Sequence, residues 1–227
     1  MTATGAVLPE PFAGWFETRG WAPHAHQLDM LTAARDGASA LLIAPTGGGK
    51  TLAGFLPSLI ELAGAEGTGD KAGLHTLYIS PLKALAVDID RNLGTPIAEM
   101  GLAVRSETRT GDTPSSKRQR QRRRPPHILL TTPESLALLL SYEDAPDIFA
   151  NLRCVIVDEL HALADNKRGD LLSLGLARVR RLAPRCRRVG LSATVADPPE
   201  LAAWLSPDGA AAGVRLVMGT AAREPDI

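Results

Sequence analysis

Residues 40–51, with the sequence ALLIAPTGGGKT, decide the fold of this chain. The apolar run at 40–44 predicts a buried strand, and the apolar residues of 51–63 recur at helical spacing. The glycines between them allow backbone N–H groups to curl around phosphate oxygens without Cβ clashes, and the start of the helix adds its positive end. The stretch therefore predicts a phosphate-binding loop formed by Thr46, Gly47, Gly48, Gly49, Lys50 and Thr51.

Two side chains of this loop have expected roles toward ATP. Lys50 is expected to reach the β- and γ-phosphates, and the Thr51 hydroxyl to ligate Mg²⁺. The general pattern begins with glycine, whereas this chain has Ala44 at that position. A glycine-rich turn that caps a helix without a ligand is the alternative. We favour the phosphate loop, because Gly-Gly-Gly-Lys-Thr at a strand-to-helix turn has little other use.

Strands and helices are expected to alternate along the chain. Helical periodicity is present at 51–63 and 82–93, and loops are expected at 64–73 and 141–146. This alternation predicts an α/β fold with a doubly wound, mostly parallel sheet and helices on both faces. Strands are expected at residues 40–44, 76–80, 127–131, 154–157 and 189–191, with 102–104 as a further candidate.

The strand expected at 154–157 ends in Asp158 and Glu159. Since the carboxyl ends of parallel strands face the ligand crevice, Asp158 is expected to hold Mg²⁺. Glu159 is expected to polarise the water that attacks the γ-phosphate, with Lys50 as the third catalytic residue. A solvated turn is the alternative for an isolated acid pair. The spacing between Lys50 and Asp158 suits two adjacent strands joined by an excursion across the sheet.

Three short motifs around these residues resemble superfamily 2 helicases. DELH at 158–161 resembles their DExH box, LSAT at 191–194 their SAT motif, and PHAHQ at 23–27 their Q motif. The resemblance implies a RecA-like lobe with ATP and Mg²⁺ as cofactors. It also implies that Gln27 contacts adenine, because a carboxamide can donate and accept hydrogen bonds at once.

Further roles follow from the same resemblance. His161 is expected to couple the ATP site to Ser192 and Thr194 through a hydrogen bond, with a packing histidine as the alternative. Where many relatives have Thr in the Q motif, this chain has His24. The aromatic residues before the Q motif are expected to pack in the core, or one of them to stack on adenine. They are Trp15, Phe16 and Trp21.

Nucleic-acid motifs of the helicases are matched as well. SPLKALA at 80–86 resembles motif Ia, and TGDT at 110–113 and TTPES at 131–135 resemble the next two. Such turns present backbone N–H groups and small hydroxyls to successive phosphates without reading sequence. The nucleic-acid contacts implied are Pro81, Lys83, Thr110, Gly111, Thr132, Pro133 and Glu134.

Four longer strings are similar to the large helicase-related (Lhr) family, in its bacterial ligase-associated DExH-box branch. They are LYISPLKALAVDIDRNL at 77–93, ETRTGDTPSSKRQRQRR at 107–123, DELHALADNKRGDLL at 158–172 and GLSATVADP at 190–198. The resemblance implies ATP-dependent 3′-to-5′ translocation on single-stranded DNA, duplex unwinding and a role in DNA repair. It also implies a functional link to an ATP-dependent DNA ligase. The residues themselves leave RNA as an alternative to DNA.

The expected domain organisation has three parts. Residues 1–22 form an N-terminal extension, 23–207 the ATP-binding lobe, and 208–227 a final strand and the start of a linker to a second RecA-like lobe. A superfamily 2 helicase binds ATP between two lobes, and the second supplies arginine fingers. We therefore expect one lobe of a helicase, with little turnover by itself. A stand-alone nucleotide- and DNA-binding module is the alternative; the Q-like, SAT and Ia motifs argue against an unrelated P-loop ATPase.

Composition leaves nucleic-acid binding to local patches. The chain has 25 basic and 25 acidic residues, so no net charge attracts phosphate. The most basic stretch is 117–124, KRQRQRRR, which is either a solvated face or a phosphate contact. No apolar run approaches the ~20 residues of a membrane span, and a cytoplasmic protein is expected. Cys154 and Cys186 are expected to be reduced thiols.

Overall fold

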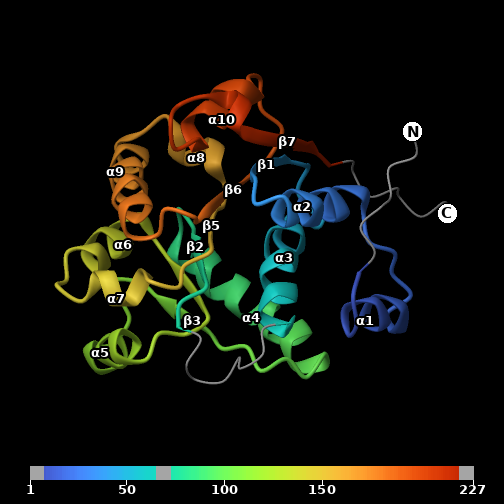
Figure 1. The fold of residues 1–227 in the computed structure, drawn as a ribbon, viewed down its shortest axis with the longest axis horizontal. Helices are drawn as coiled ribbons and strands as arrows, with labels where there is room; N and C mark the ends of the chain where they lie inside the picture. Colours follow the sequence, from blue (N-terminus) through green and yellow to red (C-terminus); the bar gives the residue numbers. More distant parts are fainter. Residues whose placement is uncertain (1–7, 65–72, 220–227) are drawn as a thin grey trace.

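The computed structural model describes residues 8–64 and 73–219, which are built around one seven-stranded sheet (Figure 1). The strand order is β3-β4-β2-β5-β6-β1-β7, and all neighbouring strands are parallel. The predicted α/β fold is therefore confirmed. The strands are β1 (Ser39–Ile43), β2 (Thr76–Ile79), β3 (Ser106–Arg109), β4 (Ile128–Thr131), β5 (Cys154–Val157), β6 (Arg187–Ser192) and β7 (Val214–Met218).

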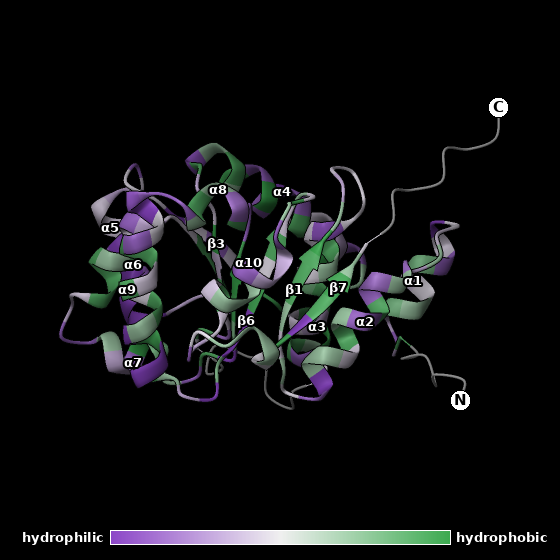
Figure 2. Ribbon diagram, turned by 90° about the horizontal axis from the view of Figure 1, so that it is seen from above, coloured by the Kyte–Doolittle hydropathy of each residue, from purple (hydrophilic) through white to green (hydrophobic). Residues whose placement is uncertain are grey.

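Helices cover both faces of the sheet, because successive strand residues point to opposite sides. Leu42 and Ile156 pack with α1 to α4, whereas Leu41 and Val155 pack with α6 to α10. Figure 2 shows hydrophobic strands between helices of mixed character. The helices are α1 (Phe12–Thr18), α2 (Ala25–Arg35), α3 (Lys50–Gly64), α4 (Lys83–Glu99), α5 (Ser115–Arg123), α6 (Pro133–Leu140), α7 (Ala145–Phe149), α8 (Leu160–Ala164), α9 (Lys167–Leu182) and α10 (Pro198–Leu205), with a 3-10 turn, η1 (Ala211–Gly213).

The spacing between Lys50 and Asp158 suggested that the strands carrying the phosphate loop and the acid pair are adjacent. This prediction is wrong. β6 lies between β5 and β1, and it pairs with each in parallel. The run 189–191 is the centre of a six-residue strand whose first two residues, Arg187 and Arg188, are buried arginines. Because charged residues seldom occupy a central strand, an apolar pattern could not reveal its full length. This insertion brings Ser192 between the two halves of the ATP site.

The strand proposed at 102–104 is also wrong. Gly101, with φ 62°, ends α4, and the Leu102 N–H donates to the Ile97 carbonyl at 2.9 Å. The apolar residues that follow therefore pack at a helix end. The edge strand β3 lies further along the chain, and only its last residue, Arg109, is buried. An edge strand exposed to solvent has no apolar signature to detect.

The two expected loops differ in detail. Residues 141–144 form a turn, but α7 begins at Ala145, whose side chain is buried. Of the loop expected at 64–73, Gly64 ends α3 and residues 65–72 lie outside the described chain. The N-terminal α1 inserts Phe12 and Phe16 into the core formed with α2 and α3.

The turns that carry the predicted functional motifs lie at one edge of the sheet. Because all the strands are parallel, the turns after β1, β2, β4, β5 and β6 lie at the same edge. The phosphate loop, motif Ia, the TTPES turn, the acid pair and the SAT motif are these turns. None of the described helices is long and apolar enough to cross a membrane.

Candidate ATP site and nucleic-acid groove

The phosphate loop connects β1 to α3 and has the backbone that its glycines permit. Gly47 and Gly49 have φ angles of 81° and 72°, in the left-handed region that favours glycine. A Cβ at Gly49 would lie 3.1 Å from Gln27 Nε2, so a side chain would fill this part of the loop. The Lys50 ammonium donates to the Ala44 carbonyl at 2.7 Å. No carboxylate of the described residues forms an ion pair with Lys50.

Gln27 lies directly behind this loop. It is 2% exposed, and its Oε1 accepts a hydrogen bond from the His24 backbone N–H at 2.9 Å in the capping box of α2. Nε2 is the carboxamide atom nearest Gly49. The His24 ring stacks on His26 with ring centroids 5.1 Å apart. The oxygen of the carboxamide expected to contact adenine therefore already accepts a hydrogen bond from its own helix.

Asp158 is held at the end of β5 by two donors. The Glu159 backbone N–H donates to Oδ1 at 2.9 Å, and the Tyr78 hydroxyl donates to Oδ2. Asp158 is 4% exposed, and Tyr78, on the adjacent strand β2, is fully buried. Burial first, and then the Asp158 charge, raise the pKa of Tyr78 far above its ordinary value, so the hydroxyl keeps its proton. Tyr78 was missed from the sequence, because a tyrosine in an apolar strand looks like a core residue.

The residues after Asp158 connect the acid pair to β6. Glu159 has φ 47°, which turns the chain sharply into α8. His161, on α8, lies with Nδ1 3.0 Å from the Ser192 hydroxyl and Nε2 3.5 Å from Glu159 Oε2. The hydrogen bond thus reaches Ser192, whereas Thr194 is exposed beyond the end of β6. One imidazole therefore contacts the acid pair and the SAT motif together.

These residues fit Mg-ATP chemically. The glycine cradle provides backbone donors, and Lys50 provides a positive charge that, among the described residues, bonds to the Ala44 carbonyl. Mg²⁺ typically takes one or two protein oxygens and completes its shell with phosphates and water, as Thr51 and Asp158 allow. Within the described residues, no cluster of three or more His, Cys, Asp or Glu forms a metal cage.

A hollow of about 410 Å³ adjoins the phosphate loop beside α1 and α4. Trp15 and Trp21 meet edge to face there, with centroids 5.7 Å apart, and the Arg19 guanidinium lies over both rings. Gly49 and Thr51 also line it. Trp21 is 52% exposed, so a flat ring system has an accessible aromatic surface next to the phosphate loop.

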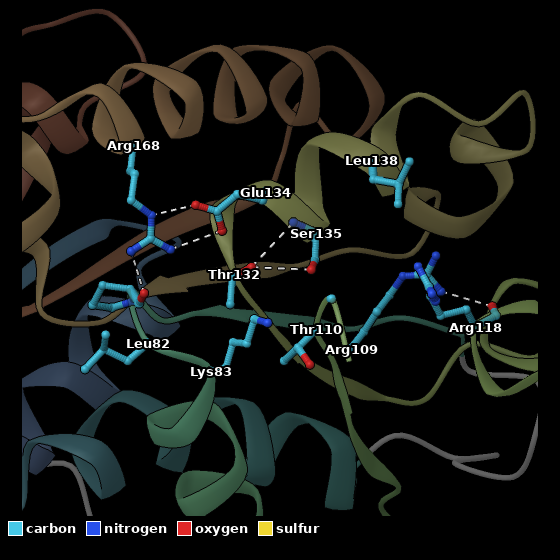
Figure 3. Close-up of a pocket in the computed structure, with 12 residues that line it drawn as sticks. Leu82, Lys83, Arg109, Thr110, Arg118, Thr132, Glu134, Ser135, Leu138 and Arg168 are labelled. Atoms are coloured by element: carbon cyan, nitrogen blue, oxygen red, sulfur yellow. Dashed lines mark hydrogen bonds and ion pairs between the residues drawn. The ribbon is translucent and has the colours of Figure 1, made fainter. Parts of the chain in front are cut away.

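A second depression, which we call the groove, lies where the motif Ia, TGDT and TTPES turns meet. It has a volume of about 450 Å³. Arg168 and Glu134 lie at one end and Arg109 and Arg118 at the other (Figure 3). The expected nucleic-acid contacts that line it are Pro81, Lys83, Thr110, Gly111, Thr132 and Glu134; Pro133 is buried in the first turn of α6 and is not a lining residue.

Arg168 holds one end of the groove together. Its guanidinium donates to both Glu134 carboxylate oxygens, at 2.5 and 3.1 Å, and to the Pro81 carbonyl at 2.6 Å (Figure 3). Hydrogen bonding to Arg168 is the main cause that lowers the Glu134 pKa to about 2. Arg168 lies in the first turn of α9, directly after the DExH-box helix α8. This bridge could not be predicted from the sequence, because a basic residue after the DExH box can equally be solvated.

The other turns of the groove are fixed locally. The Lys83 ammonium donates to both oxygens of Asp112, at 2.9 and 3.0 Å, and so joins motif Ia to the TGDT turn. Thr113 Oγ1 accepts from the Thr110 N–H at 2.9 Å and closes that turn. Thr132 is the N-cap of α6. The groove therefore combines small hydroxyl residues with the partly exposed cations Lys83 and Arg168, which suits a phosphate backbone.

Comparisons with known proteins show the family to which the chain belongs. The DEAD/DEAH box helicase family profile matches residues 24–202. The chain is 44% identical over 221 residues to the Lhr helicase/probable uracil glycosylase of Mycolicibacterium smegmatis, covering 91% of this chain and 14% of that protein. It is 44% identical over 179 residues to the ATP-dependent helicase Lhr-Core of Methanothermobacter thermautotrophicus, covering 74% and 21%.

A solved structure is similar throughout most of the chain. The Mycobacterium smegmatis helicase Lhr bound to ssDNA and AMP-PNP superposes with a TM-score of 0.85 at 40% identity, over 94% of this chain and 28% of that one. The chain thus spans between 14% and 28% of the length of these relatives. From the profile, the motifs and the matching lobe, the chain belongs to the DEAD/DEAH box helicase family and is strongly homologous to the Lhr helicases.

Proposed function

We propose that this chain is the ATP-binding lobe of an ATP-dependent DNA helicase or translocase, and that it binds Mg-ATP and single-stranded nucleic acid. The main support is that the phosphate loop, the acid pair and the groove share one edge of a parallel sheet. His161 joins the acid pair to β6, and Arg168 joins α9 to two groove turns. The helices that carry these two side chains, α8 and α9, follow each other directly in the chain.

Each residue of the ATP site has a proposed task. Lys50 leaves the Ala44 carbonyl to bind the β- and γ-phosphates, while the loop N–H groups donate to phosphate oxygens. Thr51 and Asp158 hold Mg²⁺, which neutralises charge on the phosphates when bound. Tyr78 keeps Asp158 in place, and Glu159 accepts a proton from the attacking water. Trp21 or Trp15 stacks on the adenine ring beside Gln27.

The finer functional statements rest on resemblance to the Lhr family. They are 3′-to-5′ movement on DNA, a role in DNA repair and a functional link to an ATP-dependent DNA ligase. The relative of known structure is described as bound to ssDNA and AMP-PNP, which favours DNA and ATP as ligands of this chain. We further propose that turnover requires a second RecA-like lobe to close the ATP cleft, because arginine fingers complete catalysis in this class.

A binding assay followed by an ATPase assay tests this function. The chain should bind a fluorescent ATP analogue with Mg²⁺ and a single-stranded oligonucleotide, and the oligonucleotide should stimulate ATP hydrolysis once a second lobe is supplied in trans. A Glu159→Gln variant should retain binding and lose the stimulated hydrolysis. If the added lobe restores no turnover while both ligands bind, the stand-alone binding module is the better description. If neither ligand binds, the proposal fails.

A further inference from the structure

The basic stretch 117–124 divides into two faces of α5. On one face, Lys117 and Arg120 surround Glu107, with Arg120 Nη2 2.6 Å from the carboxylate. On the other face, Arg122 pairs with Asp144 at 2.9 Å and lies 4.0 Å above the Tyr142 ring. The stretch is therefore neither a uniformly solvated face nor a uniform phosphate contact. On the first face, both cations contact the same carboxylate, Glu107.

The second face carries more positive charge than its partners neutralise. Arg109, Arg118 and Arg122 gather around Tyr142, and Asp144 pairs with Arg122. Arg109 is 1% exposed and donates through Nη1 to the Arg118 carbonyl, but its Nη2 is buried without a hydrogen-bond partner. Burial first, and then repulsion by the two neighbouring arginines, lower the Arg109 pKa. An anion would relieve this repulsion.

Arg118 lies where two depressions meet. It lines the far end of the groove, as Figure 3 shows, and also a second hollow of about 600 Å³. Ser115, Ser116, Gln119, Arg122 and Tyr142 form the rest of this hollow. Within the described chain, the Arg118 side chain forms no ion pair, and its Nε is buried without a partner. The N-cap of α5 is Pro114, which provides no side-chain cap for the first turn.

These features are what a phosphate site requires. An uncapped helix start offers N–H groups and a positive dipole, the two serines add hydroxyls, and Arg118 adds a guanidinium without a carboxylate. We propose that the nucleic-acid strand continues past the TGDT turn over the first turn of α5, where Arg118 holds a further backbone phosphate. This site rests on the proposed nucleic-acid binding and extends it beyond the motif residues. Arg122 and Tyr142 line the same hollow as Arg118.

The salt dependence of oligonucleotide binding tests this site, because each phosphate contact on a single strand contributes about 0.7 to the slope of log K against log salt. Arg118→Gln should reduce the slope by about 0.7 and weaken binding roughly fivefold at about 0.1 M salt. Arg118→Lys keeps the charge and should restore most of the slope. Arg120→Gln is the matched control and should leave the slope unchanged, because the Arg120 guanidinium already pairs with Glu107.

Shortening the oligonucleotide separates this site from the groove. The Arg118→Gln deficit should disappear for strands too short to pass the TGDT turn, while a Lys83→Gln deficit should persist at every length that binds. If Lys83→Gln weakens binding and Arg118→Gln does not, the α5 site is overturned and the groove stands. If the unchanged chain binds no oligonucleotide, the proposed function fails and this site fails with it. DNA and RNA strands of equal length distinguish the two sources of phosphate.

Discussion

The ATP site and the groove lie at the same sheet edge but are held in opposite ways. In the ATP site, Asp158 is buried and receives a hydrogen bond from the buried Tyr78, and Lys50 is folded onto a backbone carbonyl. In the groove, the ion pairs Arg168–Glu134 and Lys83–Asp112 are between two-fifths and three-quarters exposed. Buried partners fix geometry in advance, whereas exposed ion pairs exchange readily with a phosphate ligand. The difference suits a rigid ATP site beside a groove that must release its nucleic-acid ligand.

Lys50→Ala is expected to have the largest effect on ligand binding. Removing one partner of a desolvated charge pair typically costs about 2–5 kcal/mol, so Mg-ATP affinity should fall at least roughly 30-fold. Titration with a fluorescent ATP analogue measures this loss. Lys167→Ala, an exposed lysine at the start of α9, should leave affinity unchanged. Equal losses in the two variants would show that general charge, not the phosphate loop, attracts the nucleotide.

Tyr78→Phe tests the buried contact with Asp158 in the ATP site. It removes the hydroxyl that donates to Asp158 and leaves a buried carboxylate oxygen with one partner fewer. We expect the free energy of unfolding to fall by about 1–3 kcal/mol and Mg²⁺-dependent nucleotide affinity to fall with it. Denaturant unfolding gives the first quantity. Tyr142→Phe, which removes a hydroxyl from a half-buried ring, is the control. Unchanged stability in Tyr78→Phe would mean that Asp158 is fixed by its backbone alone.

The same contrast explains what the sequence could predict. The phosphate loop and the acid pair follow apolar strands, so their type, order and shared edge could be predicted from periodicity. The position of β6 could not, because its buried Arg187 and Arg188 hide the strand and tertiary pairing alone inserts it between β5 and β1. Arg187 is buried because it pairs with Glu61 on α3 at 2.9 Å. That partner lies far away in the sequence.

The groove residues show the same limit. The turns could be predicted from short motifs, but Arg168 reaches Glu134 and Pro81 from separate segments. A basic pair on the surface has no local signal that distinguishes such a bridge from solvation. Likewise, the division of α5 into two faces depends on Glu107 and on Tyr142, which lie in other elements. Local patterns predict elements, while long-range polar partners decide which charges remain available.

Arg168→Gln tests whether the exposed bridge positions the groove. It frees the Glu134 and Pro81 turns, so oligonucleotide affinity should fall a few-fold while stability changes by about 1 kcal/mol or less. Glu134→Gln and the double variant should show similar losses, because one bridge is removed in each case. The slope of log K against log salt should not change. A slope lower by about 0.7 would instead make Arg168 a phosphate contact itself.

The pH dependence of stability tests the Arg168–Glu134 ion pair directly and has the smallest expected effect. The folded pKa of Glu134 is lowered to about 2 by Arg168, below the ordinary glutamate value of about 4.3. The stabilisation is therefore complete above the unfolded pKa and is lost as pH falls from about 4.3 toward about 2. The difference in unfolding free energy between the unchanged chain and Arg168→Gln should shrink over this range. Because the Glu134 side chain is 51% exposed, solvent screening keeps the difference under about 1 kcal/mol.

Glu143→Gln, an exposed neighbour on the turn after α6, should show no such pH dependence. A difference between the unchanged chain and Arg168→Gln that stays constant down to pH 2 would mean that Arg168 acts through the Pro81 carbonyl, which does not titrate, and that the groove end is held by a neutral hydrogen bond.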